Sequence, residues 1–257
     1  MVRAKRCYTP GLVWHLTHRC HKKEFLLKFS KDRDRYLKLL YHAKKHFKFH
    51  VLDYIITSNH IHLLVYDLGK KNIIPDSMQY IAGRSGQEYN NRKNRRGAFW
   101  DDRYHATAIQ SGPHLVQCMM YIALNMVRTG VVKHPREWAW TGYHEILNPK
   151  QRYSIVDHAN MQKLFCAGTL SEFQDSYKEW IESGLTGFGY LEKDSRWSKS
   201  VAVGTKDYVR SIKDRLGKRA SGREVSEPDD GKYYLKEPGV EYELQNENAI
   251  YWDRQKE

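Results

Sequence analysis

Four stretches of the chain have the pattern of β-strands. In residues 12–20, apolar side chains recur at every second position, which would place them on one side of a strand. Residues 51–57 are rich in β-branched side chains, residues 60–65 alternate, and residues 105–110 form a further short candidate. Ser58 and Asn59 separate the second stretch from the third, and this short spacing predicts a hairpin.

The segments between these strands repeat their apolar residues at helical spacing. The first helix is predicted to begin at Ser30 or Asp32, either of which could cap it, and to end near Phe49. A second helix is predicted to open at Pro75. A third is predicted over residues 111–129, because a proline lies near its start and a glycine follows its end.

The order of these elements is β-α-β-β-α-β-α, which predicts the α+β class, an antiparallel sheet covered by helices. We assign this domain to residues 1–150. Residues 151–225 are expected to form a mainly helical C-terminal extension, and residues 226–257 a linker with an acidic, aromatic tail. Within the extension, Ser171 and Gln174 have the spacing of a capping box. Helices are predicted there at residues 157–165, 171–183 and 205–216.

The charge of the chain narrows the class of partner. A formal net charge of +13 at pH 7 favours polyanions, above all nucleic acid, although a basic protein without such a role is the alternative. The 18 tyrosines and 7 tryptophans could stack on unpaired bases, but most are expected in the core. The apolar runs are too short to span a membrane, we find no signal peptide, and the four cysteines form no close pair. We therefore expect a cytoplasmic protein.

His60 and His62 are the first candidates for chemistry. In the alternating stretch they would share one face of a strand, with apolar residues on the other face. Two neutral imidazoles at this spacing can bind one divalent metal ion. Because the motif is short, the pair could equally be polar residues on a solvated face. Three further histidines on predicted strands, His15, His18 and His105, are expected to be core or surface residues.

A second candidate group lies on the predicted helix at 111–129. Gln117, Tyr121, Asn125 and Arg128 follow one another at steps of four, four and three, and so form one stripe. A purely structural helix would more often carry lysine and glutamate there. Tyr121 could attack a phosphate that a metal ion polarises, and Asn125 could give that ion an oxygen ligand. Tyr121 could also be a packing residue, and Asn125 could bond a neighbouring loop.

A basic run interleaved with aromatic residues follows the second predicted helix. Such a run suits a flexible loop that binds nucleic acid, although a plain solvated loop would have the same composition. The candidate DNA contacts are Arg92, Lys93, Arg95, Arg96, Trp100 and Arg103 in this run, and Arg128 on the helical stripe.

These motifs resemble those of the REP-associated tyrosine transposases, which belong to the single-tyrosine HUH (His-hydrophobe-His) transposases. Residues 60–62 match the His-hydrophobe-His motif. Residues 121–128 resemble the Tyr-Ile-x-x-Asn-Pro-Val-Arg helix of that family, with Met126 in place of the usual proline. The resemblance covers roughly residues 8–150, and includes the segment 97–105 and the cluster of Trp138, Trp140 and Tyr143.

The resemblance implies a ferredoxin-like sheet and a metal-dependent endonuclease and strand-transferase that acts on single-stranded or hairpin DNA. Tyr121 would be the nucleophile that forms a 5′-phosphotyrosine intermediate. His60, His62 and Asn125 would bind magnesium or manganese, of which manganese suits imidazole better. The resemblance further implies a monomer or homodimer with no membrane partner, in the nucleoid-associated cytoplasm of a prokaryote. It implies no role for the C-terminal extension.

Two other functions fit the same residues. A catalytically idle DNA-binding protein could occupy repeated hairpin elements, and it would bind DNA without a covalent adduct. A zinc hydrolase could use His60, His62 and one of the other histidines. It would bind zinc tightly and would keep its activity in the Tyr121→Phe variant.

Overall fold

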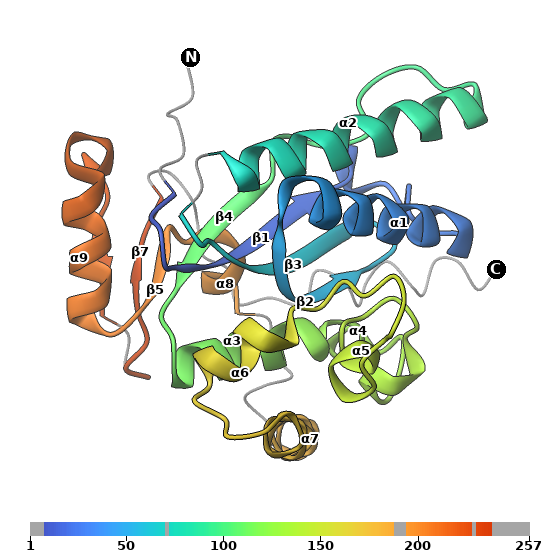
Figure 1. Cartoon of the computed structure of the whole chain (residues 1–257). Helices are drawn as coiled ribbons and strands as arrows, with labels where there is room; N and C mark the ends of the chain where they lie inside the picture. The colour runs from blue at the N-terminus through green and yellow to red at the C-terminus, as the bar shows by residue number, and fades with distance from the viewer. Residues whose placement is uncertain (1–7, 70–71, 188–193, 228–229, 238–257) are drawn as a thin grey trace.

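In the parts of the chain that the computed structural model describes, residues 8–69, 72–187, 194–227 and 230–237, the fold is built on a seven-stranded β-sheet. Helices cover both faces of this sheet (Figure 1). The α+β class predicted from the sequence is therefore confirmed. Most of the predicted acidic tail lies outside the described residues.

Four long strands form the part of the sheet that the sequence predicts. β1 (Val13–Arg19) lies between β3 (His60–Tyr66) and β4 (His105–Ile109), and β2 (His50–Ile56) pairs with the other edge of β3. All three pairings are antiparallel. The order β2-β3-β1-β4 is that of a ferredoxin-like sheet, and β2 and β3 form the expected hairpin.

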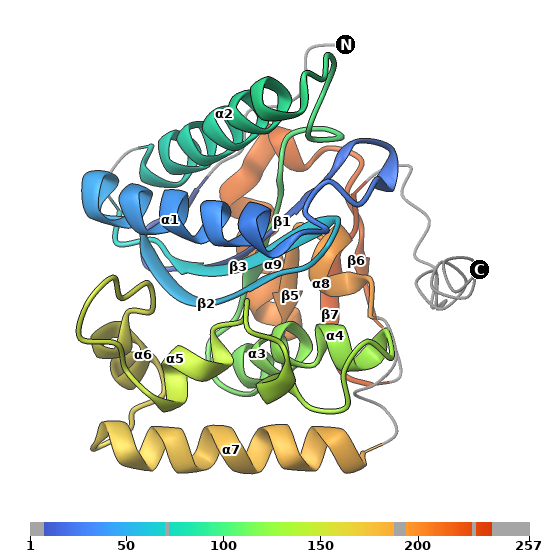
Figure 2. The same ribbon diagram turned by 90° about the vertical axis from the view of Figure 1, so that its right-hand side faces the viewer.

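Two layers of helices enclose these strands, one on each face (Figure 2). One layer consists of α1 (Ser30–Phe47) and α2 (Ile73–Lys93). The opposite layer follows β4 along the chain. It consists of α3 (Pro113–Ala123), α4 (Asn125–Arg128), α5 (Tyr143–Leu147), α6 (His158–Leu164) and α7 (Leu170–Thr186). Short 3₁₀ turns occur at His21–Lys23, Pro135–Glu137 and Gly217–Ala220.

The C-terminal extension completes the sheet as well as adding helices. After α8 (Arg196–Lys199), β5 (Ala202–Gly204) pairs in parallel with β4, and α9 (Lys206–Leu216) packs beside it. β7 (Tyr233–Leu235) and β6 (Val225–Ser226) then extend the same edge. The sequence analysis did not predict these three strands, because each is shorter than the run of four to eight residues from which alternation can be recognised.

The boundaries of three predicted helices need correction. The predicted helix at 111–129 is interrupted at Leu124, whose ψ of 4° ends α3 before α4 begins. α2 continues to Lys93, so the start of the basic run is helical and not a loop. α7 starts with a capping box made by Thr169 and Glu172, not by Ser171 and Gln174. The Thr169 box carries a glutamate at its third helical position, so its carboxylate accepts from the cap backbone.

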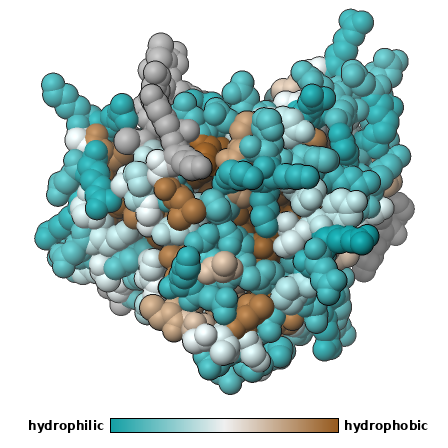
Figure 3. Space-filling view, in the orientation of Figure 1, coloured by the Kyte–Doolittle hydropathy of each residue, from teal (hydrophilic) through white to brown (hydrophobic). Residues whose placement is uncertain are grey.

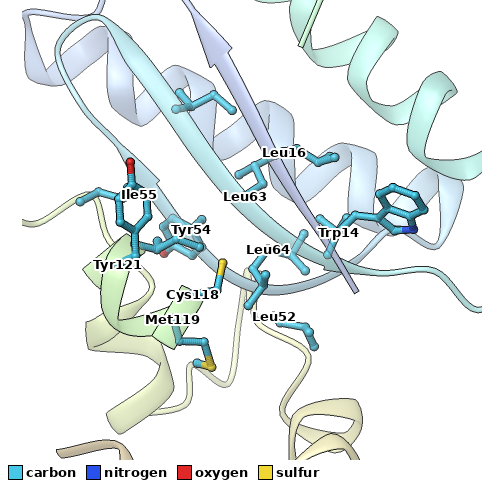
Figure 4. Packing of buried hydrophobic residues seen from close by; sticks show 14 of the residues in the cluster. Trp14, Leu16, Leu52, Tyr54, Ile55, Leu63, Leu64, Cys118, Met119 and Tyr121 are labelled. Atoms are coloured by element: carbon cyan, nitrogen blue, oxygen red, sulfur yellow. The ribbon is translucent and has the colours of Figure 1, made fainter. Parts of the chain in front are cut away.

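The core lies on both sides of the sheet, because its central strands are covered by helices on each face. Ile55, Cys118 and Met119 fill the space between the sheet and α3, and Tyr121 joins them at the end of that helix (Figure 4). The predicted aromatic cluster after residue 130 is also buried or packed on the core. One consequence matters for the site: a polar residue that points from the sheet toward α3 is shielded from water.

Candidate active site

The histidine pair lies on β3, which has β2 on one side and β1 on the other. The imidazole planes of His60 and His62 are nearly perpendicular, with ring centroids 5.0 Å apart. His60 Nδ1 lies 2.6 Å from Asn59 Oδ1 and 3.0 Å from Thr57 Oγ1. Because the amide oxygen of Asn59 can only accept, His60 carries its proton on Nδ1. Its Nε2 is then the nitrogen with the lone pair, as a metal ligand requires.

His62 is 3% exposed and lies on the face of the sheet that packs against α3. Its Nδ1 lies 2.9 Å from His15 Nε2, and its Nε2 lies 3.2 Å from Asn125 Nδ2. Burial lowers the pKa of His62 well below its ordinary value, and the neighbouring basic groups act in the same direction. His62 is therefore neutral, and so able to bind a metal ion through nitrogen.

Asn125 opens α4 directly after the break at Leu124. Its Oδ1 is buried and has no hydrogen-bond partner among the described residues, although its Nδ2 faces His62. Rotation of the amide would turn this oxygen toward the lone pair of His62 Nε2. Two acceptors facing one another fit a cation between them. With His60, the residues offer a divalent metal two imidazole nitrogens and one amide oxygen.

In the part of the chain that the structure describes, no carboxylate or thiolate completes this set. Among the described residues, no three histidine, cysteine, aspartate or glutamate side chains are arranged to hold a metal ion. A metal site at the histidine pair thus depends on Asn125 and on oxygen atoms that a substrate brings. The three-histidine zinc site considered from the sequence has no counterpart in this part of the chain.

Tyr121 lies near the end of α3, with its ring centroid 5.7 Å from that of His62. The side chain is 7% exposed, and burial raises the pKa of its phenol above the ordinary value of 10.0. Arg128 and a hydrogen bond to the side chain of Ser198 act in the opposite direction. The phenol is therefore protonated at neutral pH but lies beside groups that favour its anion.

Arg128 packs directly on Tyr121. The centre of its guanidinium lies 4.1 Å from the centroid of the phenol ring, and its Nη2 donates to the backbone oxygen of Tyr121 at 2.8 Å. Its Nη1 is buried and has no hydrogen-bond partner among the described residues. Burial lowers the pKa of this guanidinium, but arginine keeps its charge at neutral pH. Arg128 thus supplies a fixed positive charge next to the candidate nucleophile.

The C-terminal extension reaches this site, which the sequence analysis missed. The backbone oxygen of Trp197 on α8 lies 2.7 Å from His15 Nδ1, and the indole is 6.4 Å from the ring of Tyr121. Next along the chain, the backbone oxygen of Ser200 accepts from His105 Nε2 at 2.8 Å and from Thr107 Oγ1 at 2.7 Å. The sequence carries one local indication of this contact, which is the presence of Trp197 in an otherwise polar segment. A tryptophan in such a segment is as typical of a core residue as of a functional site.

Most of the candidate DNA contacts in the basic run have partners within the protein. Arg92 pairs with Asp32, the ammonium of Lys93 lies 5.2 Å from the Phe29 ring, and Arg95 Nη1 donates to the backbone oxygen of Ala98 at 2.9 Å. These contacts position the end of α2. They leave their outer faces available to solvent, so DNA contact by these residues remains a prediction.

Trp100 packs on the opposite face of the sheet from the histidine pair. Its ring stacks on His18 at 4.0 Å, and its Nε1 donates to the backbone oxygen of Ala82 at 3.2 Å. Arg96 and Arg103 flank this segment and are exposed. The face of the molecule in Figure 3 is mostly hydrophilic, with scattered apolar patches. None of the described helices has the length and apolar character needed to cross a bilayer.

Comparison with known protein families finds a match to part of the chain. Residues 9–125 match the family model described as "Transposase IS200 like". This segment, a little less than half of the chain, is similar to the IS200-like transposases, and the resemblance to transposases is confirmed. The matched segment contains His60, His62, Tyr121 and Asn125, and it ends before the C-terminal extension.

Two solved structures are similar to the chain. One is a REP-associated tyrosine transposase bound to a REP hairpin, with 17% sequence identity and a TM-score of 0.48, covering 61% of this chain and 94% of that one. The other is a putative transposase from Deinococcus radiodurans R1, with 17% identity and a TM-score of 0.33, covering 44% of this chain and 89% of that one. No curated protein matches the sequence.

Proposed function

We propose that this transposase cuts and rejoins single-stranded DNA beside a hairpin, with Tyr121 as the nucleophile and a divalent metal ion held by His60, His62 and Asn125. One observation carries the proposal. The ring of Tyr121 lies 5.7 Å from that of His62, whose Nε2 is in turn 3.2 Å from the amide of Asn125. His62 and Asn125 are 63 positions apart in the sequence, yet both are buried between the sheet and the helices α3 and α4.

The metal ligands would all be neutral, since both histidines are uncharged and the third ligand is an amide. When bound, a divalent ion would withdraw charge from the scissile phosphate and stabilise the departing 3′-oxygen. The ligands would not offset its charge, and Arg128 would add one more positive charge beside Tyr121. Manganese fits two imidazoles better than magnesium does, while magnesium is compatible with the oxygen ligands that the DNA supplies.

Tyr121 would attack the phosphorus through its phenol oxygen. The bond from this oxygen to phosphorus forms as the bond to the 3′-oxygen breaks. The fragment downstream of the cut is then joined to the tyrosine through its 5′-phosphate, and the upstream fragment leaves with a 3′-hydroxyl. The phenol gives up its proton, and the departing 3′-oxygen takes up a proton to become the hydroxyl. Arg128 supports the phenolate through its charge over the ring, and Ser198 supports it by a hydrogen bond. Attack by a 3′-hydroxyl on the phosphotyrosine reverses the step and joins DNA.

The partner would be single-stranded or hairpin DNA, bound by a monomer or homodimer without membrane contact, in the nucleoid-associated cytoplasm of a prokaryote. The net charge of +13 supports an anionic partner. The exposed side chains of Arg96 and Arg103, together with the outer faces of Arg92, Lys93 and Arg95, are the proposed backbone contacts. Trp100 would act by packing behind them.

A covalent-adduct gel tests the proposal. Labelled hairpin oligonucleotides with single-stranded flanks are incubated with wild-type protein in manganese or in chelator, and then denatured. We expect a shifted band that requires metal, is lost in Tyr121→Phe and is kept in the control variant Tyr66→Phe, whose phenol lies at the far end of β3. Hairpin binding without an adduct would instead identify an idle DNA-binding protein. Zinc-dependent hydrolysis that survives Tyr121→Phe would identify a hydrolase.

A further inference from the structure

A chain of buried hydrogen bonds joins the C-terminal extension to the histidine pair. It runs from the backbone oxygen of Trp197 to His15 Nδ1 at 2.7 Å, and from His15 Nε2 to His62 Nδ1 at 2.9 Å. The two imidazole planes are 19° apart, with ring centroids separated by 5.0 Å, an arrangement that is compatible with this hydrogen bond. His15 itself is 0% exposed, so no water competes for either nitrogen.

The carbonyl of Trp197 determines which nitrogens of His15 and His62 carry a proton. A backbone carbonyl can only accept, so His15 must carry a proton on Nδ1. The partners of the buried His15 ring are a carbonyl and a second imidazole, neither of which would offset a charge, so the ring is neutral and its Nε2 accepts. The bond between the rings then needs a proton on His62 Nδ1. This leaves the lone pair of His62 on Nε2, the nitrogen that faces Asn125.

We propose that His15 is a positioning residue of the active site, which uses the backbone oxygen of Trp197 to hold His62 in the tautomer that presents Nε2 to a metal ion. This inference rests on the proposed function, because it assigns His15 a role toward the metal that His62 would bind. Metal-binding histidines usually donate their second nitrogen to a carboxylate, a carbonyl or water. Here a second imidazole takes that place, and the backbone oxygen of Trp197 in the C-terminal extension fixes the position of its proton.

The position of His15 in the sheet favours this role over simple packing. His62 lies opposite Thr17 in the pairing of β1 with β3, which makes His15 its diagonal neighbour on the same face. His60 receives the same proton arrangement from Asn59 on its own turn. Both members of the histidine pair thus have an acceptor for Nδ1. The acceptor of His60 is the adjacent Asn59, and that of His62 is His15 on the neighbouring strand β1.

Two substitutions of similar polarity separate the role from packing. In His15→Gln, the terminal amide reaches the place of Nε2, so its oxygen can still accept from His62. In His15→Asn, the shorter amide reaches the place of Nδ1, so it can still donate to Trp197 but leaves His62 without an acceptor. Both variants remove the ring, so a packing defect would appear in both.

The first measurement is the tautomer of His62 in the metal-free, full-length protein, from nitrogen-detected imidazole NMR. We expect Nδ1 protonation in the wild type and in His15→Gln, and a mixture of tautomers in His15→Asn. The second is manganese binding without DNA, followed by the electron paramagnetic resonance of the free ion. We expect binding about 10–100-fold weaker in His15→Asn and close to that of the wild type in His15→Gln. His60→Ala serves as the reference for loss of the site.

The outcomes separate this inference from the proposed function. If both variants keep the tautomer and the manganese affinity of the wild type, or if both lose them equally, His15 only packs and the inference is wrong. If the wild type binds no manganese that depends on His60, the metal site of the proposed function fails instead. The NMR measurement needs no metal, so it still decides whether His15 sets the tautomer of His62.

Discussion

Burial of His15 makes the protein sensitive to acid by an amount that can be worked out. Its pKa is lowered from 6.5 to about 3, chiefly by burial. Between these values the unfolded chain binds a proton that the folded protein does not. Stability is therefore complete above pH 6.5 and falls as the pH is lowered, by about 1.4 kcal/mol per pH unit. From pH 7.5 to pH 4.5 the loss from His15 alone amounts to about 2.5 kcal/mol.

Urea unfolding of the metal-free protein at pH 7.5, 6.5, 5.5 and 4.5 measures this loss. His15→Gln lacks the titrating group, so its free energy of unfolding should fall less across this range, by about 2–3 kcal/mol. Carboxylates titrate in both proteins and cancel in the difference. His42→Gln, at an exposed position of α1, should fall as steeply as the wild type. Identical pH dependence in wild type and His15→Gln would refute the argument that His15 is buried in its neutral form.

Three further substitutions test other features of the structure. Burial raises the pKa of Asp53 well above its ordinary 3.8, so the unfolded chain loses this proton first and the fold becomes less stable as the pH rises. Asp53→Asn should therefore be more stable than the wild type in urea unfolding, with a larger difference at pH 8 than at pH 5. A Cβ at Gly142 would overlap Asp53 Oδ1, so Gly142→Ala should lower the free energy of unfolding by about 1–3 kcal/mol. The control is Gly83→Ala inside α2, where an added Cβ has no neighbouring atom within 4 Å, and this variant should have a higher thermal midpoint than the wild type. Arg128→Gln removes the charge over the Tyr121 ring, and should slow adduct formation about tenfold or more while hairpin affinity changes little; an unchanged adduct rate would contradict that role.

The residues of the candidate site that could be predicted are those fixed by local spacing. His60 and His62 share a face because a strand alternates, and Tyr121 and Asn125 stay close because they are one helical turn apart. That spacing survives the break at Leu124, since the backbone N–H of Leu124 still donates to the oxygen of Met120 at 2.9 Å. The four long strands could also be predicted, because each has a local alternating or β-branched pattern and the order of elements indicates how they pair.

The parts that could not be predicted depend on contacts between distant segments. The partners of His15 are 47 and 182 positions away, so no periodicity along the chain distinguishes it from an ordinary core histidine. The short strands of the extension form because β4 offers an open edge, which is a property of the folded sheet. Trp197 lies on a four-residue helix, too short to leave a helical pattern in the sequence.

The parallel pairing of β5 with β4 has a consequence for synthesis of the protein. Thr107 and the Ser200 oxygen that it contacts are 93 positions apart, and the carbonyl of Trp197 enters the site with the same segment. At about 5–20 residues per second, the ribosome completes the Tyr121 helix several seconds before it adds α8. During these seconds the nascent chain contains His15 but not the carbonyl of Trp197 to which it donates. The protons of the site reach their final arrangement only after the ribosome has added α8 and the segment that follows it.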